Sequence, residues 1–157
     1  MKIMDILVND AVILNLGAGS KREVLAEMAG ALAKVEPQIE GDRLLEVLLE
    51  REALQSTGIG DGVAIPHGKM AGLDRLVASF ARSSEGVDFE SIDRRPTHHF
   101  FLLVVPEHSG GQYLKALARI GGVGQKKLDR FGQIFLAVLD EHRGSAQHTA
   151  SEPTLPR

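Results

Sequence analysis

The apolar run at residues 100–105 is the feature that most constrains the fold. It reads Phe-Phe-Leu-Leu-Val-Val, without a polar residue and rich in aromatic and β-branched side chains. Such a run is typical of a central strand buried on both faces. A strand of this kind needs other elements packed over each side of its sheet. The sequence therefore predicts an α/β sandwich, with a sheet flanked by helices on both faces.

Two helices are expected before this strand. Ser20 and Glu23 form a capping-box pattern, in which each side chain satisfies a free backbone N–H. Apolar residues then follow at helical spacing until Pro37 stops the helix. The apolar positions are Val24, Leu25, Met28, Leu32 and Val35. Asp42 is expected to cap a second helix, which ends near Arg51 and Glu52.

Short strands are expected at residues 11–16, 63–65 and 76–81. Three glycines and an aspartate crowd residues 56–62, and polar residues fill 83–95, so both segments are predicted to be loops. Further helices are expected at 112–120 and near 130–142, with glycines at 121, 122 and 124 between them. We expect one domain over residues 1–143, atypical from about 121, and a disordered polar tail at 144–157.

Composition narrows the functional classes. The 157 residues contain 21 acidic and 18 basic side chains, for a formal charge of −3. A broad nucleic-acid footprint would need a strongly basic face, so no nucleic-acid partner is expected. There is no cysteine, and hence no disulfide framework or thiolate zinc site. No signal peptide or membrane-spanning run is recognisable, which predicts a cytoplasmic protein without membrane insertion.

The glycine-rich segment before His67 does not fit the common nucleotide motifs. A P-loop has four residues between its glycines and then Lys-Ser or Lys-Thr, whereas five residues separate Gly62 from Gly68 and Met70 follows Lys69. The dinucleotide fingerprint G-x-G-x-x-G does not match the even spacing of glycines 58, 60 and 62.

What remains is a histidine at the end of a short strand, between Pro66 and Gly68. Pro66 restricts the backbone, and Gly68 permits close approach by another backbone or by a partner protein. Hydroxyl donors from Ser56 and Thr57, together with the guanidinium of Arg51, suit a phosphoryl group. A neutral imidazole is a competent nucleophile near pH 7.

These residues alone predict a candidate anion site and no more. A histidine after a proline in a glycine-rich segment is often only a turn residue. Arg51 alone is equally typical of a solvated cation that complements the C-terminal end of a helix dipole.

A resemblance carries the interpretation further. The stretch Glu52-x6-Ile59-Gly60-x2-Val63-Ala64-Ile65-Pro66-His67-Gly68 resembles the signature of the fructose/mannitol-type IIA (EIIA type-2) domain of the phosphoenolpyruvate-dependent phosphotransferase system. Arg51-Glu52 and Ser56-Thr57-Gly58 are similar to the same family immediately upstream. The likeness covers roughly residues 1–120, and it implies an α/β sandwich around a mixed β-sheet.

The resemblance also implies roles for individual residues. His67 is the phosphorylated histidine, expected as the tele (Nε2) isomer, and Arg51 is its phosphate-binding partner. Ser56 and Thr57 support the phosphate. Tyr113 stands where the family usually has a second active-site histidine; its hydroxyl could donate to a phosphoryl oxygen but cannot carry positive charge. No metal and no cofactor are expected.

The chain looks most like the nitrogen-regulatory branch of this family. Members of that branch receive phosphate from a histidine phosphocarrier protein and regulate target proteins by their phosphorylation state, in nitrogen and potassium control. The alternative is a sugar-specific IIA protein, which passes phosphate to a cysteine on a separate IIB protein in fructose or mannitol uptake.

Two competing classes stay open at this point. A zinc hydrolase would need three converging ligands, such as His67, His108 and an acid. His98 and His99 are strand neighbours that point to opposite faces, which disfavours a shared metal. A purely structural protein would show no labelling by phosphoenolpyruvate and the general phosphotransfer proteins.

Overall fold

The computed structural model describes residues 3–108. The chain divides into two units, Met1–Val123 and Gly124–Arg157, and all the described residues belong to the first. The helices expected at 112–120 and 130–142, the boundary at 143, the polar tail and Tyr113 lie outside the described residues. None of the helices in residues 3–108 is long and apolar enough to span a bilayer.

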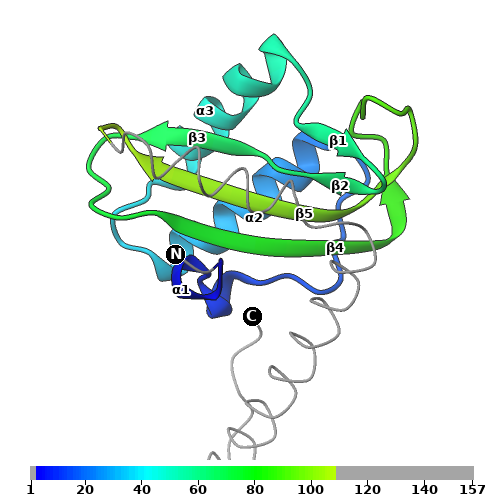
Figure 1. Ribbon diagram of the computed structural model, residues 1–157. Coiled ribbons are helices and arrows are strands. Elements are labelled where there is room, and N and C mark those ends of the chain that lie inside the picture. The colour runs from blue at the N-terminus through cyan, green and yellow to red at the C-terminus, as the bar shows by residue number, and fades with distance from the viewer. Residues whose placement is uncertain (1–2, 109–157) are drawn as a thin grey trace, which may run out of the picture. The chain divides into compact units, whose positions relative to one another are not determined.

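A mixed sheet is built around β5 (Thr97–Pro106). The long strand β4 (Val77–Val87) pairs with β5 antiparallel on one side. On the other side, β2 (Val63–Ala64) and β3 (His67–Met70) both run parallel to β5, at different points along its length. β1 (Gly58–Gly60) adds an antiparallel pair to β2 (Figure 1). This is the mixed α/β architecture that the sequence predicts.

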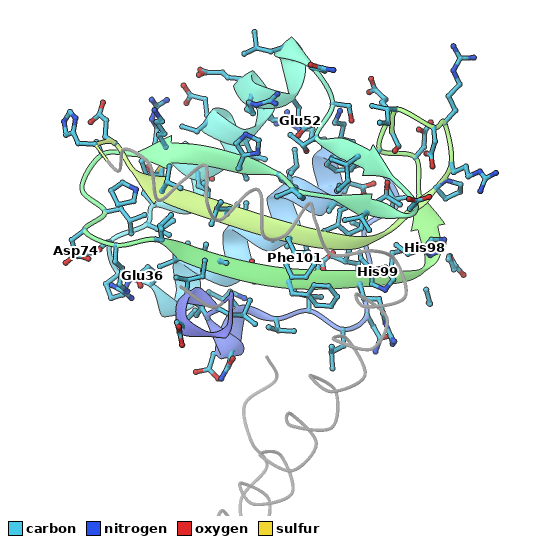
Figure 2. The ribbon with its side chains drawn as sticks, in the orientation of Figure 1. Glu36, Glu52, Asp74, His98, His99 and Phe101 are labelled. Carbon is cyan, nitrogen blue, oxygen red and sulfur yellow. The ribbon has the colours of Figure 1, made fainter. Side chains whose placement is uncertain are left out.

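The prediction that β5 is central and buried on both faces is confirmed. Phe100, Leu102 and Val104 point into the core cluster that also contains the helix side chains. Their neighbours on the opposite face, such as Phe101, are equally buried. There Phe80 of β4 packs on Phe101 with ring centroids 4.9 Å apart, on the side of the sheet seen in Figure 2.

Two helices pack on each other and on the core face of the sheet (Figure 1). α2 (Lys21–Val35) begins as predicted, because the Ser20 hydroxyl accepts a hydrogen bond from the Glu23 N–H at 3.2 Å. It ends just before Pro37. α3 (Gly41–Leu54) follows, but its N-cap residue is Glu40. The prediction that Asp42 caps this helix is wrong: Asp42 lies inside the first turn, where its charge complements the helix dipole.

The N-terminal segment differs from its prediction. A short α1 (Ile3–Ile6) and a 3₁₀ turn, η1 (Asn9–Ala11), come first, and no regular strand forms at 11–16, where one was expected. The chain then runs along the edge of β4 with a single bridge, Ile13 to Ala81. Backbone hydrogen bonds from Ile13 N–H to Phe80 and from Arg82 N–H to Ile13 hold it there, both 2.9 Å long.

Two predicted loops contain strand. β4 stays paired with β5 as far as the pair Val87–Thr97. The loop predicted to start at residue 83 therefore starts only after Val87. β1 lies inside the glycine-rich segment, since Gly58 and Gly60 pair with β2. A Cβ atom on Gly58 would lie 2.9 Å from the Cα of Ser91, which is in the loop between β4 and β5. Close packing of β1 on that loop therefore requires glycine.

Candidate phosphoryl-acceptor site

His67 is the first residue of β3, not the last residue of a strand as expected. Ile65 and Pro66 separate β2 from β3, and both strands pair with β5. The Pro66 carbonyl accepts a hydrogen bond from Leu103 N–H at 2.9 Å, which ties this segment to the central strand. The imidazole therefore lies where the chain passes from β2 to β3.

The Ile65 carbonyl determines which ring nitrogen of His67 carries the proton. It lies 2.8 Å from Nδ1, and a carbonyl oxygen can only accept a hydrogen bond. Nδ1 must therefore be the protonated nitrogen in the neutral ring, which leaves the lone pair on Nε2. Ile65 is itself held, because its N–H donates to the Thr57 carbonyl at 3.0 Å.

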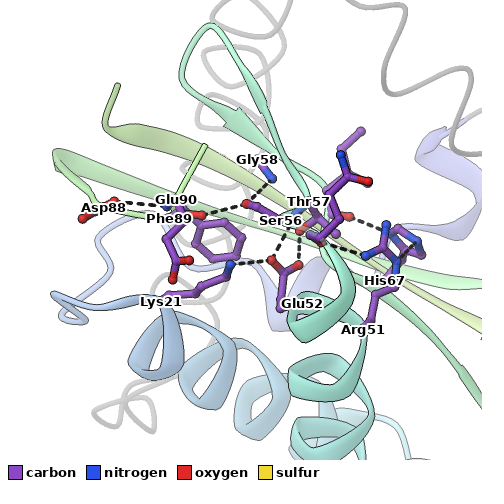
Figure 3. Close-up of polar contacts among 12 residues, drawn as sticks. Lys21, Arg51, Glu52, Ser56, Thr57, Gly58, His67, Asp88, Phe89 and Glu90 are labelled. Carbon is purple, nitrogen blue, oxygen red and sulfur yellow. Dashed lines mark hydrogen bonds and ion pairs between the residues drawn. The ribbon is translucent and has the colours of Figure 1, made fainter. Parts of the chain in front are cut away.

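Arg51 stands at this unprotonated nitrogen (Figure 3). It lies in the last turn of α3, and its Nε–H donates to His67 Nε2 at 3.2 Å. Its Nη1 donates to the Gln55 carbonyl at 2.8 Å, which fixes the direction of the guanidinium. The structure thus brings together the two residues that the sequence pairs.

The surroundings keep the imidazole neutral. Burial is the largest influence and lowers the pKa of His67 below its ordinary 6.5; the positive charge of Arg51 lowers it further. The hydrogen bond to the Ile65 carbonyl and the negative charge of Glu52 oppose this, but the net direction of the pKa is down. At neutral pH the ring is therefore uncharged.

Gly68 has a packing reason that the sequence did not reveal. Where a backbone or a partner protein was expected to approach, α3 lies instead. A Cβ atom at position 68 would come within 2.5 Å of Val47 Cγ1, so only glycine lets α3 lie this close to β3. The closeness matters because α3 carries Arg51 to His67.

Ser56 and Thr57 lie beside the site, but their hydroxyl protons are directed elsewhere. The Ser56 hydroxyl donates to the Phe89 carbonyl at 2.8 Å and accepts from Gly58 N–H at 3.1 Å. The Thr57 hydroxyl donates to the Glu52 carboxylate. Both residues shape the loop that precedes His67, and their contact with a phosphoryl group stays a prediction.

The sequence reasoning gave no role in the site to Glu52, although it begins the family signature, and none to Lys21. The Glu52 side chain is only 5% exposed, and its Oε1 lies 2.8 Å from Lys21 Nζ. A signal was present: Leu44, Leu48 and Glu52 are four residues apart, so the glutamate continues the buried stripe of α3. A charged residue in that stripe indicates a buried partner.

The other histidines within residues 3–108 do not join His67. His99 is buried and stacks on Phe80 with centroids 6.0 Å apart, whereas His98 is partly exposed and its Nδ1 lies 2.9 Å from the Ser83 carbonyl. His67 pairs with Leu103 near the middle of β5, whereas His108 lies in the turn after the end of β5 at Pro106. Within residues 3–108, no group of three or more histidine, aspartate or glutamate side chains is arranged to hold a metal ion.

A hollow of about 420 Å³ lies at the connection between β4 and β5. Its lining includes Asp88, Ser91 and Arg95, and none of the residues that contact His67 takes part. Acidic and basic side chains both face it, so it offers no net preference for an anion.

Fold and site together are those of a phosphotransfer domain: a mixed sheet carries a buried histidine whose Nε2 accepts a hydrogen bond from an arginine. The family model for the phosphoenolpyruvate-dependent sugar phosphotransferase system, EIIA 2, matches residues 5–130, and the chain belongs to this family. It is accordingly a phosphotransferase-system component of the EIIA type.

Individual relatives refine the comparison. The chain is 44% identical over 120 residues to a nitrogen regulatory protein of Bradyrhizobium diazoefficiens, covering 76% of this chain and 78% of that one. It is 38% identical over 120 residues to the fructose-specific EIIABC component of Bacillus subtilis, covering 76% of this chain but only 19% of that protein. The crystal structure of nitrogen regulatory protein IIA-Ntr from Neisseria meningitidis superposes with a TM-score of 0.71 at 35% identity, covering 77% of this chain and 82% of that one.

Proposed function

We propose that His67 accepts a phosphoryl group on Nε2, as a tele-phosphohistidine. The observation that carries this proposal is the hydrogen bond from Nδ1–H to the Ile65 carbonyl, which leaves the Nε2 lone pair facing Arg51. In the reaction, Nε2 attacks phosphorus and a new P–N bond forms. The P–N bond to the imidazole of a donor histidine phosphocarrier protein breaks, and its electron pair returns to the donor ring.

Arg51 is proposed to serve the product as well as the reactant. Once phosphorus occupies Nε2, the guanidinium loses its hydrogen bond to that nitrogen. It then faces phosphoryl oxygens, to which a planar fork can donate two hydrogen bonds. Ser56, Thr57 and Tyr113 are proposed as further donors to these oxygens. For Ser56 and Thr57 this requires their hydroxyls to leave Phe89 and Glu52.

Labelling by phosphoenolpyruvate, enzyme I and a histidine phosphocarrier protein tests the acceptor. The wild-type chain should gain one phosphoryl group, detectable as an acid-labile mass increase. His67→Ala should gain none, and His98→Ala serves as a control with a histidine outside the site. Normal labelling of His67→Ala rejects the assignment.

We further propose that the phosphorylation state regulates target proteins in the cytoplasm, in nitrogen or potassium control. The similarity to nitrogen regulatory proteins over most of their length supports this role. A phosphoryl group adds nearly two negative charges at a neutral imidazole, enough to admit or repel a partner surface.

The second candidate is a sugar-specific EIIA that donates to a separate EIIB protein, and the fructose-specific relative supports it. Gene deletion separates the two roles. Regulation predicts normal growth on fructose and mannitol with disturbed nitrogen or potassium responses. A sugar-uptake defect, with rapid phosphate loss from His67 to a sugar-specific EIIB, would reverse the choice.

A further inference from the structure

Near His67, the buried carboxylate of Glu52 is held by several polar partners (Figure 3). It accepts hydrogen bonds from both the backbone N–H and the hydroxyl of Thr57, the first at 3.0 Å. It also pairs with the Lys21 ammonium at 2.8 Å. A buried carboxylate is costly unless its oxygens are satisfied in this way, so the arrangement calls for a reason beyond packing.

Lys21 is held in an unusual position for a cation. It is the first residue of α2, where the helix dipole disfavours positive charge. Glu52 offsets this, and the ammonium also lies 4.9 Å from the centroid of the Phe89 ring. The Ser56 hydroxyl donates to the carbonyl of the same Phe89. The N-terminus of α2 is thereby joined to the loop that precedes β1.

From Glu52 a continuous set of hydrogen bonds reaches the imidazole. Glu52 holds Thr57; the Thr57 carbonyl accepts from Ile65 N–H at 3.0 Å; and the Ile65 carbonyl lies 2.8 Å from His67 Nδ1. Each member orients the next, because Ile65 is fixed through both its N–H and its carbonyl. Partners of this kind set the tautomer and the ring orientation of functional histidines.

We propose that Glu52, clamped by Lys21, is a positioning residue for phosphoryl transfer: through Thr57 and Ile65 it holds the proton of His67 on Nδ1 and keeps Nε2 unprotonated. The inference rests on the proposed role of His67 as acceptor. The charge of Glu52 acts in the same place, since it partly offsets the lowering of the His67 pKa by burial and Arg51.

The test uses the whole chain in two near-isosteric variants. Glu52→Gln removes the charge and one acceptor, and Thr57→Val removes the hydroxyl. ¹⁵N NMR of the unphosphorylated protein reports the share of the Nδ1–H and Nε2–H tautomers of His67. The rate of labelling by a phosphorylated histidine phosphocarrier protein is measured in parallel.

Glu36→Gln is the matched control. Glu36 is the other buried glutamate of the described chain; it pairs with Arg75 and accepts from Gln38 N–H at 3.4 Å. It follows the C-terminal end of α2, and Figure 2 labels it well apart from Glu52. All three variants remove a buried polar contact and should lower the unfolding midpoint.

Only the two site variants should shift the tautomer population toward Nε2–H and slow labelling, by about tenfold as for other outer partners of functional histidines. Wild-type tautomers and rates in both variants, or an equal shift in Glu36→Gln, would overturn the inference. If Glu52→Gln does not fold, Thr57→Val decides. The tautomer measurement needs no phosphate, so it tests the effect of Glu52 on the His67 ring independently of phosphorylation. Normal labelling of His67→Ala would reject His67 as the acceptor, but it would not change the tautomer result.

Discussion

The Nε atom of Arg51 lies 3.2 Å from Nε2 of His67, although the two residues are 16 positions apart and belong to a helix and a strand. The positive charge of Arg51 has different effects on the unphosphorylated ring and on the proposed phosphorylated product. In the unphosphorylated protein, the guanidinium disfavours a second proton on the ring, which lowers the pKa of His67. In the proposed product it faces a dianionic phosphoryl group and stabilises it.

Arg51→Lys tests this dual role. An ammonium keeps the charge but loses the planar fork that reaches both Nε2 and the Gln55 carbonyl. We expect labelling of His67 to slow by about tenfold, with the unfolding midpoint close to wild type. A time course of quenched labelling reactions measures the rate, and thermal unfolding measures the midpoint. A large drop in midpoint with an unchanged rate would assign Arg51 to the helix end alone.

The lowered pKa of His67 predicts how stability depends on pH. Between 6.5 and the lower folded pKa, the unfolded chain binds more protons than the folded chain. The contribution of His67 to stability is therefore complete above about pH 6.5 and is lost as the pH falls through the folded pKa.

Urea unfolding at about pH 7.5 and about pH 5.5 measures this effect. His67→Gln should lose less stability than wild type over that interval, while the remaining histidines contribute equally to both proteins. An identical pH dependence in the two proteins would contradict a lowered pKa.

Gly68→Ala tests the approach of α3 to β3. The new methyl group would lie 2.5 Å from Val47 Cγ1, and a valine in a helix has little rotamer freedom to move away. Overpacking of this kind costs about 1–3 kcal/mol of unfolding free energy. The double variant Gly68→Ala/Val47→Ala should recover part of that loss. Additive losses in the double-mutant cycle would mean that the two side chains do not compete for the space.

Tyr113 stays a prediction from the family resemblance. Tyr113→Phe should change the lifetime of the phosphohistidine, because a hydroxyl donor to a phosphoryl oxygen is lost, and Tyr113→His should be tolerated. Hydrolysis of labelled protein followed by mass spectrometry gives the lifetime. A wild-type lifetime and transfer rate for Tyr113→Phe would make it a packing residue only.

Local patterns determined much of this protein in advance. The apolar run at 100–105 predicted the central strand, because a sequence without a polar face must be buried on both sides. Ser20 and Pro37 set the ends of α2 through one cap and one missing N–H, both local effects. The motif around His67 indicated the family, which the family model confirms; that His67 is the phosphoryl acceptor stays a prediction.

Tertiary structure decided the chemistry of the site. Which ring nitrogen of His67 carries the proton depends on where the Ile65 carbonyl points, and that follows from the pairing of β2 and β3 with β5. The hydroxyl of Ser56 found its partner 33 residues away, at Phe89, and the Glu52 carboxylate met Lys21 from another helix. Spacing along a chain identifies which groups need partners, because burial and periodicity are local. Which partner each group receives is determined only when distant segments pack, since a hydrogen bond acts over about 3 Å regardless of sequence separation.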